Sequence, residues 1–238
     1  MKGVILAGGT GTRLRPLTNL MNKHLLPVGK YPMIYYAIKK LADAGIQDIL
    51  LVIGKQSAGM YVDYLGSGND FGVRITYKIQ DQAGGIAEAL SLASDFIEAN
   101  EKFVVLLGDN LFTDSLLPFV QEFQSQPEGA KVILKMVDDA RRYGVPVIEG
   151  AIIKSILEKP ENPPSNYCVT GIYMYDNEVF ELVAQIDPSS RGELEITDVN
   201  NLYAAKGVLT YNVMNGWWTD AGTMESLHEA GAKLKEGE

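Results

Sequence analysis

The sequence predicts an α/β fold with a mixed, mainly parallel sheet flanked by helices. Short apolar runs rich in β-branched residues alternate with segments of helical periodicity. The first of these runs are apolar on both faces, which is typical of parallel strands that helices cover on both sides. A glycine-rich segment directly follows the first run, at the position where open α/β sheets bind their ligands.

The first half of the chain supplies the parallel part of the prediction. Residues 2–6 (KGVIL) and 48–54 (DILLVIG) are expected strands, and apolar residues from Met33 to Ala42 recur at helical spacing between them. Further elements follow in the same alternation: a strand at 73–79, a helix at 85–97 and a strand at 102–110. This order of strands and helices indicates parallel crossovers.

The rhythm changes near residue 130, where strands follow one another after short connections. The expected strands cover 130–137, 145–149, 151–159 and 166–175. Such short connections favour antiparallel pairing, so we expect these strands to join the sheet in that direction. Helices are expected at 195–207 and 223–237, with a strand at 208–214 between them.

Charge and cysteine content limit the partners and the compartment. Lysine and arginine number 21 against 30 aspartates and glutamates, a formal net charge of −9. This balance argues against nucleic acid or anionic membrane as partners, and no apolar run has the length of a membrane span. Cys168 is the single cysteine, so no intrachain disulfide can form; we expect it to be a small buried side chain in a reducing, cytoplasmic setting.

The segment LAGGTGTRLRP, residues 6–16, combines bare backbone with positive charge. Glycines at 8, 9 and 11 leave amide N–H groups open to phosphate oxygens, while Arg13 and Lys23 add cationic donors. A plain glycine turn is the alternative. The Walker loop is excluded because Thr12 and Arg13 follow Gly11, and the dinucleotide fingerprint of a dehydrogenase is broken at Leu14.

Motifs along nearly the whole chain resemble the sugar-1-phosphate nucleotidylyltransferases, and among them the glucose-1-phosphate thymidylyltransferases. They are LAGGTGTRLRPLT, NKHLLPVGKYPMIYY, GDN, YGV, LEKP, YCVTGIYMYD, RGELEITDVN and WWTDAGT. The resemblance implies one Rossmann-like domain over 1–238, with a nucleotide-binding half at about 1–110 and a sugar-phosphate-binding half at about 111–238. It also implies a homo-oligomer. Longer members carry a C-terminal tail that contributes to a regulatory site, and we expect part of that site to be missing here.

The implied reaction joins dTTP to glucose 1-phosphate with Mg²⁺, by in-line attack on the α-phosphorus. The sugar phosphate is already an anion, so no general base is needed and the site must supply cations, amides and metal. The resemblance implies metal binding by Asp109 and Asp220, each of which follows an apolar or aromatic run; capping of a turn is the alternative for either one. The two histidines, His24 and His228, are not accompanied by a nucleophile motif.

The resemblance also implies a role for each matching residue. The catalytic set is Arg13, Lys23, Asp109, Lys159 and Asp220. The nucleotide-binding set is Leu6, Ala7, Gly8, Gly9, Thr10, Gly11, Thr12, Arg13, Lys23, Gln80, Gly85 and Asp109. The set for the sugar phosphate is Asn110, Tyr143, Gly144, Glu158, Lys159, Val169, Gly171, Tyr173 and Arg191.

Local chemistry qualifies some of these assignments. The amide of Gln80 offers a donor and an acceptor, as the edge of thymine or uracil requires. Adjacent strand residues face opposite sides, so Glu158 and Lys159 can serve one site only at a strand end or bulge, which Pro160 marks; two solvated surface charges are the alternative. The chain departs from the family at His24, where glutamine is usual, and at Pro146 and Ile148, where we expect altered strand pairing.

Two other functions stay open at this stage. A related transferase could use UTP or another sugar phosphate, because few hydrogen bonds decide between such substrates. A non-catalytic sensor of nucleotide sugars could be built on the same fold, although it would have no need to keep both aspartates.

Overall fold

The computed structural model describes residues 1–235 and divides into two compact units. Unit 1 consists of Met1–Ala83, Leu106–Leu117 and Gly216–Glu238, and unit 2 of Gly84–Val105 and Pro118–Asn215. The units are therefore interleaved along the chain. The division into halves that bind nucleotide and sugar phosphate stays a prediction, and the end of the helix expected at 223–237 lies outside the described residues.

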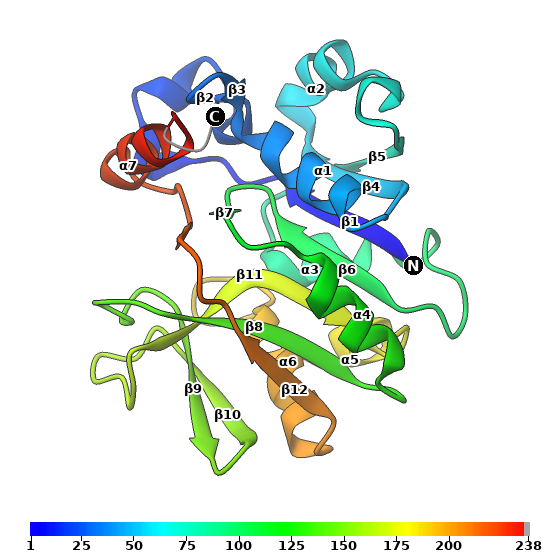
Figure 1. The fold of residues 1–238 in the computed structure, drawn as a ribbon, viewed down its shortest axis with the longest axis vertical. Coiled ribbons are helices and arrows are strands. Elements are labelled where there is room, and N and C mark those ends of the chain that lie inside the picture. Colours follow the sequence, from blue (N-terminus) through cyan, green and yellow to red (C-terminus); the bar gives the residue numbers. More distant parts are fainter. Residues whose placement is uncertain (236–238) are drawn as a thin grey trace. The chain divides into compact units, whose positions relative to one another are not determined.

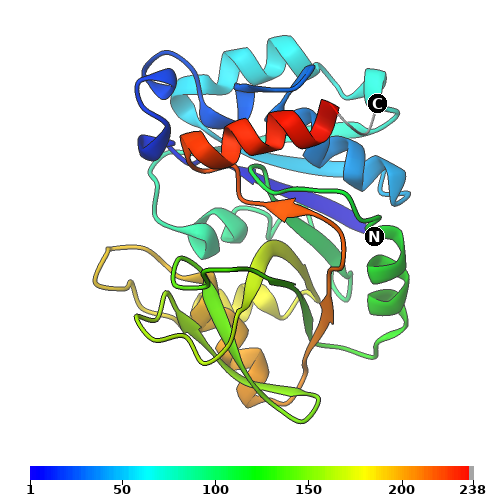
Figure 2. The ribbon, with the colours of Figure 1, turned by 60° about the vertical axis from the view of Figure 1, so that its left-hand side comes forward.

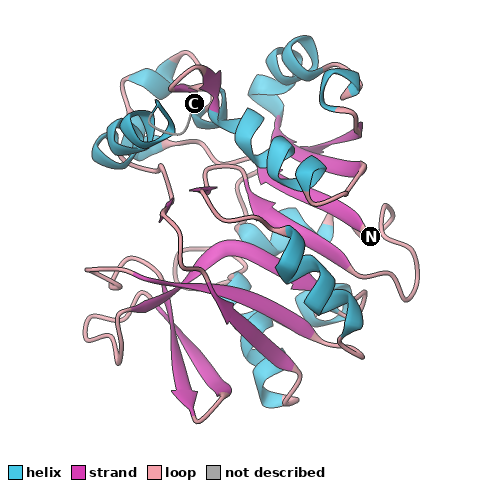
Figure 3. Cartoon of the chain, viewed as in Figure 1, coloured by secondary structure: helices cyan, strands magenta, loops and turns pink. Residues whose placement is uncertain are grey.

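A seven-stranded, mainly parallel sheet confirms the predicted fold class (Figure 3). Its strands, in spatial order, are β12 (Leu209–Val213), β8 (Ala130–Met136), β11 (Tyr167–Tyr175), β6 (Phe103–Leu107), β1 (Lys2–Ala7), β4 (Asp48–Gly54) and β5 (Arg74–Gln80). In unit 1, β4 pairs with both β1 and β5 in parallel, and the register aligns Gly54 with Gln80. The carboxyl ends of these strands therefore lie at one edge of the sheet.

Helices of unit 1 cover the apolar strands as the periodicity predicts. Helix α1 (Met33–Asp43) buries Met33, Ile34, Ala37, Ile38 and Leu41, and the sequence did not indicate helix α2 (Ala58–Leu65). Helix α7 (Met224–Lys235) packs against β2 (Pro27–Val28), as Figures 1 and 2 show. The short strands are β3 (Tyr31–Pro32), β7 (Leu111–Phe112) and β13 (Trp218–Thr219).

Short 3-10 helices connect the elements of unit 1. They are η1 (Thr12–Leu14), η2 (Leu17–Asn19), η3 (Lys23–Leu25), η4 (Lys55–Ser57) and η5 (Asn69–Phe71). None of the helices within residues 1–235 has the length and apolar character needed to cross a membrane.

In unit 2 the strand pairing partly corrects the prediction. Strands β8 and β11 pair antiparallel in the sheet as expected, but β12 pairs with β8 in parallel. Strands β9 (Gly144–Glu149) and β10 (Ile152–Glu158) do not join the sheet; they form a separate antiparallel hairpin. The tight turn at Gly150, with φ 64°, lets the two strands satisfy each other's backbone groups locally. The register within the hairpin shifts between Ile153 and Ser155, and the altered pairing expected at Pro146 and Ile148 stays a prediction.

The helices of unit 2 are α3 (Ile86–Ser91), α4 (Leu117–Ser125), α5 (Val179–Val183) and α6 (Ile196–Ala205). The prediction of a helix over 85–97 was too long. Ser91 donates a hydrogen bond to the Glu88 carbonyl, and turns follow from there. Helix α6 packs on β10, where the Asn201 side chain bonds both backbone groups of Ile156. Cys168 is buried, as expected.

Candidate active site

The glycine-rich segment that begins at Gly8, called the glycine loop below, follows the carboxyl end of β1 in unit 1 and is packed tightly against its neighbours. A Cβ at Gly8 would lie 2.1 Å from the Gln80 Oε1, and a Cβ at Gly54 would lie 3.2 Å from the Gly8 carbonyl oxygen. Gly11 has φ 65° and is the N-cap of η1. The Gln80 side chain thus lies against the loop, and a residue with a side chain at position 8 would displace it.

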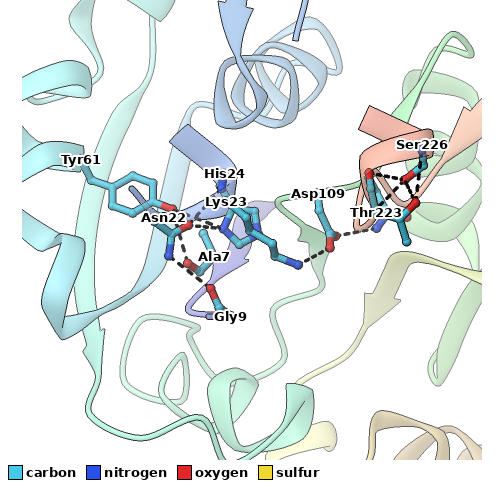
Figure 4. A network of polar contacts seen from close by, with 10 residues as sticks. Ala7, Gly9, Asn22, Lys23, His24, Tyr61, Asp109, Thr223 and Ser226 are labelled. Atoms are coloured by element: carbon cyan, nitrogen blue, oxygen red, sulfur yellow. Dashed lines mark hydrogen bonds and ion pairs between the residues drawn. The ribbon is translucent and has the colours of Figure 1, made fainter. Parts of the chain in front are cut away.

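Lys23 and Asp109 form an ion pair across the base of the loop (Figure 4). Asn110 donates to the Asp109 carboxylate at 3.0 Å and accepts from the Trp218 indole at 2.8 Å. Burial raises the pKa of Asp109. The charge of Lys23, together with His24 and the hydrogen bonds from Lys23 and Asn110, lowers the pKa by more than burial raises it, to about 2. Asp109 is therefore ionised at neutral pH, although only 8% of it is exposed.

The segment after β13 brings Asp220 near the same loop. Strand β13 pairs with β7 with Thr219 opposite Leu111, so Asp220 continues the ladder toward Asn110. The Arg13 guanidinium lies against this segment, because a Cβ at Gly222 would meet its Nη2 at 3.0 Å. The structure thus brings together Arg13, Lys23 and the segments that carry both aspartates.

A polar network that includes the buried side chains of Tyr61 and His24 joins the loop to α2 (Figure 4). The Tyr61 hydroxyl donates to the Asn22 Oδ1 at 2.9 Å, and Asn22 donates through Nδ2 to the Gly9 carbonyl at 3.2 Å. His24 contacts Asn22 through its backbone N–H and its Nδ1, at 3.0 and 2.8 Å. Burial and then the charge of Lys23 lower the pKa of His24 to about 3. The imidazole is therefore neutral, and only 2% of it is exposed.

A cavity of about 690 Å³ opens beside the loop in unit 1. Gly8, Gly9, Thr10 and Gln80 line it, as the sequence analysis predicts for a ligand pocket. Arg15, one of the cations clustered at this loop in the sequence, also lines it, whereas Asn22, Lys55, Gln56 and Asp81 were not expected there. Lys55, Gln56 and Asp81 directly follow β4 or β5, so their position after parallel strands was a usable signal.

Unit 2 holds a second ionic cluster, at the end of β10. Glu158 is the last strand residue, and Lys159 has φ 44°, a left-handed conformation uncommon for a residue with a side chain. This reversal brings the Lys159 Nζ to 2.8 Å from Glu158 Oε1, the geometry that a strand end permits. Thr197 donates to the other Glu158 oxygen at 2.6 Å. Burial raises the pKa of Glu158, and the bonds from Lys159 and Thr197 lower it below its usual value.

Arg191 lies in the same cluster and faces three carboxylates. Its Nη2 contacts Glu195 at 2.8 Å, Glu158 at 3.3 Å and Glu193 at 3.7 Å. Ser189 also donates to Glu195, at 2.7 Å, which fixes the loop that carries the arginine. The sequence indicated Arg191, Glu158 and Lys159 but not Glu193, Glu195 or Thr197, since those contacts depend on how the loop folds.

The remaining predicted residues of unit 2 surround this cluster or lie on β11. Tyr143 accepts a bond from the Lys159 N–H at 3.0 Å, and Gly144 pairs with Glu158 in the hairpin. Gly85 has φ 104°, and a Cβ there would lie 2.5 Å from the Leu194 carbonyl oxygen. Val169, Gly171 and Tyr173 lie on β11, where the register with β8 shifts between Val169 and Tyr173.

Comparisons with known proteins place these motifs in a wider context. A family model described as nucleotidyl transferase matches residues 2–237. A glucose-1-phosphate thymidylyltransferase of Neisseria meningitidis is 43% identical over 97% of this chain and 81% of its own length. A low-salt glycan biosynthesis nucleotidyltransferase of Haloferax volcanii is 37% identical over 99% of this chain and 66% of its own.

Solved structures show the same similarity. A crystal structure of a Bacillus anthracis protein assigned as a glucose-1-phosphate thymidylyltransferase, in complex with sucrose, has 57% identity and a TM-score of 0.95, covering 99% of this chain and 96% of that one. A UDP-glucose pyrophosphorylase complexed with UDP-glucose has 27% identity and a TM-score of 0.87, covering 100% and 99% of the two chains.

Proposed function

Because this chain belongs to the nucleotidyl transferase family, we propose that it transfers a thymidylyl group from dTTP to glucose 1-phosphate. The observation that carries the proposal is the similarity over nearly the whole chain to an enzyme of that name, 43% identical. The site supports the same proposal. The glycine loop, Arg13, Lys23 and Asp109 bring groups that suit phosphate and its metal ion to one place in an acidic protein.

In the proposed reaction, a phosphate oxygen of glucose 1-phosphate attacks the α-phosphorus of dTTP. A new P–O bond forms, the bond to the β-phosphate breaks, and pyrophosphate leaves with its electron pair. The attacking oxygen carries no proton that must be removed, so positioning and charge neutralisation supply the catalysis. We assign these tasks to Arg13, Lys23 and Lys159.

The proposal assigns one set of residues to each substrate. We assign dTTP to the residues of the glycine loop. We assign its pyrimidine base to Gln80 and Gly85, and add Leu6 and Ala7, which precede the loop at the end of β1. We assign glucose 1-phosphate to Glu158 and Lys159 with Arg191, together with the other predicted residues of that set: Asn110, Tyr143, Gly144, Val169, Gly171 and Tyr173.

Mg²⁺ fits the oxygen donors that the chain offers. Asp109 is ionised and Asp220 follows the strand paired beside it, whereas no group of three or more acidic, histidine or cysteine side chains gathers within residues 1–235. Mg²⁺ is usually bound through one or two carboxylates with substrate phosphates and water, so two aspartates are an adequate protein contribution. When bound, the ion would neutralise charge on the phosphates.

The cytoplasmic location and the homo-oligomeric state remain parts of this proposal. The first draws support from a chain with a single, buried cysteine. The second rests on the family resemblance alone, and gel filtration with light scattering tests it.

A pyrophosphate-release assay tests the proposed function. Purified protein with Mg²⁺ is given a panel of nucleoside triphosphates and sugar 1-phosphates, and the highest kcat/KM is expected for dTTP with glucose 1-phosphate. A preference for UTP would move the chain to the related transferases, toward the UDP-glucose pyrophosphorylase whose fold it shares. Release with none of the pairs would contradict catalysis and favour a sensor.

A further inference from the structure

The network of Tyr61, Asn22 and His24 has no role in the assignments above, yet it contacts the glycine loop directly (Figure 4). Tyr61 is completely buried on α2, 54 residues from the Ala7 carbonyl that its hydroxyl contacts at 3.4 Å. The His24 Nδ1 lies 3.4 Å from the same hydroxyl. A helix outside the loop thus reaches the loop through side-chain hydrogen bonds.

These contacts hold carbonyl groups of the loop on one side. The Ala7 carbonyl accepts from Tyr61 at 3.4 Å, and the Gly9 carbonyl accepts from Asn22 at 3.2 Å. In a planar trans peptide the C=O and the following N–H point in opposite directions. The N–H groups of Gly8 and Thr10 therefore point away from the hydrogen-bonded carbonyls and stay free of the bonds to Tyr61 and Asn22, and both residues line the cavity beside the loop.

The same asparagine also orders the turn that carries Lys23. Its side chain accepts from the His24 N–H and caps η3, the short helix that begins at Lys23. The His24 ring is packed too closely to move freely, since a Cβ at Gly108 would lie 2.9 Å from its Cδ2. One buried network therefore sets both the direction of the loop amides and the position of the lysine.

We propose that Tyr61, Asn22 and His24 are positioning residues that hold the Gly8 and Thr10 amides, together with Lys23, ready for the nucleotide phosphates. The inference rests on the proposed function, which assigns the loop to dTTP. In this role His24 acts as a neutral internal link and not as a contact to the base or sugar, in agreement with its burial. The three residues act through the loop and touch no reacting atom.

Tyr61→Phe is the sharpest test, because it removes one buried oxygen and leaves the ring in place. We expect the KM for dTTP to rise about tenfold, the scale of one hydrogen bond to a charged group, with the KM for glucose 1-phosphate within about twofold of wild type. Tyr175→Phe is the matched control. Tyr175 is equally buried and donates to Asn200 at 2.7 Å in unit 2, so it reports the cost of losing a buried hydroxyl away from the loop, and both of its KM values should stay near wild type.

Calorimetric binding of two probes adds a readout that does not need turnover. Pyrophosphate should bind Tyr61→Phe about tenfold more weakly than wild type, whereas thymidine should bind both proteins equally. Asn22→Ala serves as the second variant if Tyr61→Phe does not fold, and it should show the same selective loss. Unchanged dTTP and pyrophosphate constants in a folded variant, or an equal loss of affinity for thymidine, would overturn the inference. A wild-type protein that binds pyrophosphate but transfers no nucleotide would contradict the proposed function alone.

Discussion

The two units hold their ionic groups in different ways. In unit 1, Lys23 and Asp109 form one pair whose side chains are 15% and 12% exposed. In unit 2, Arg191 is 44% exposed and shares three carboxylates. Water screens the second arrangement far more than the first, so a single charge matters more in the Lys23–Asp109 pair than around Arg191. Substitutions of Lys23 or Asp109 should strongly alter the charge of the site and the catalytic rate. Substitutions of Arg191 should change the affinity for the ligand more than the stability of the fold.

Asp109→Asn should have the largest effect of any single charge removal. The change keeps the size of the side chain but leaves Lys23 without its buried partner and removes a carboxylate that we assign to Mg²⁺. We expect kcat to fall on the order of a hundredfold to a thousandfold, measured by pyrophosphate release at saturating substrates. Asp139→Asn is the control, since Asp139 forms an exposed pair with Arg141 and its loss should leave kcat unchanged. Near-normal turnover of Asp109→Asn would remove the contrast between the units.

Glycine substitutions test whether the backbone is more tightly constrained in unit 2 or in unit 1. Gly85→Ala in unit 2 forces a side chain into φ 104° and against the Leu194 carbonyl, which should lower the free energy of unfolding by about 2–3 kcal/mol. Gly8→Ala in unit 1 meets only the end of the Gln80 side chain, so it should cost about 1 kcal/mol or less while raising the KM for dTTP. Urea unfolding and initial-rate kinetics separate the two outcomes.

Gly59→Ala is the matched control for both, because open space surrounds this position in α2. It should leave the KM for dTTP unchanged and keep or slightly raise stability. A larger loss of stability for Gly8→Ala than for Gly85→Ala would show that the glycine loop, and not unit 2, carries the backbone constraint.

The sequence predicts elements well where the pattern is local. The apolar runs of β1 and β4 and the helical spacing of α1 reflect burial of particular faces, which neighbouring residues determine. The Lys23–Asp109 pair spans 86 residues, so no spacing rule could supply it; the charge around the glycine loop indicated Lys23, and the family resemblance indicated Asp109. The partners of Arg191 and the role of Tyr61 depend on tertiary packing, and the sequence alone did not indicate them. The β9–β10 hairpin was misplaced for the same reason, because local pairing and pairing in the sheet give the same strand pattern.

The pH dependence of stability should also distinguish unit 1. Burial, then the charge of Lys23, lowers the pKa of His24 from 6.5 to about 3. The unfolded chain takes up this proton near pH 6.5 while the folded chain does not. His24 therefore does not lower the free energy of unfolding above pH 6.5. As the pH falls from 6.5 toward 3, the free energy of unfolding decreases by about 1.4 kcal/mol per pH unit.

His24→Gln removes this titration and should flatten the loss of stability below pH 6.5, measured by urea unfolding between neutral and mildly acidic pH. His228→Gln, on the exposed surface of α7, is the control and should follow the wild-type curve. Equal slopes for His24→Gln and wild type would mean that the imidazole is not held neutral in unit 1.

Glu193→Gln should have the smallest effect on folding and tests the other half of the comparison. Glu193 is 40% exposed and lies 3.7 Å from Arg191, so its loss should change the free energy of unfolding by less than about 0.5 kcal/mol. It also removes one of the anions that compete with a sugar phosphate for this arginine, so the KM for glucose 1-phosphate should fall by about twofold, and by less at high salt. Glu149→Gln, which loses an exposed contact to Lys154 at 3.9 Å, is the control and should leave that KM unchanged. If Glu193→Gln instead destabilised the fold by several kcal/mol, the network of unit 2 would be as tightly coupled to folding as the buried pair of unit 1.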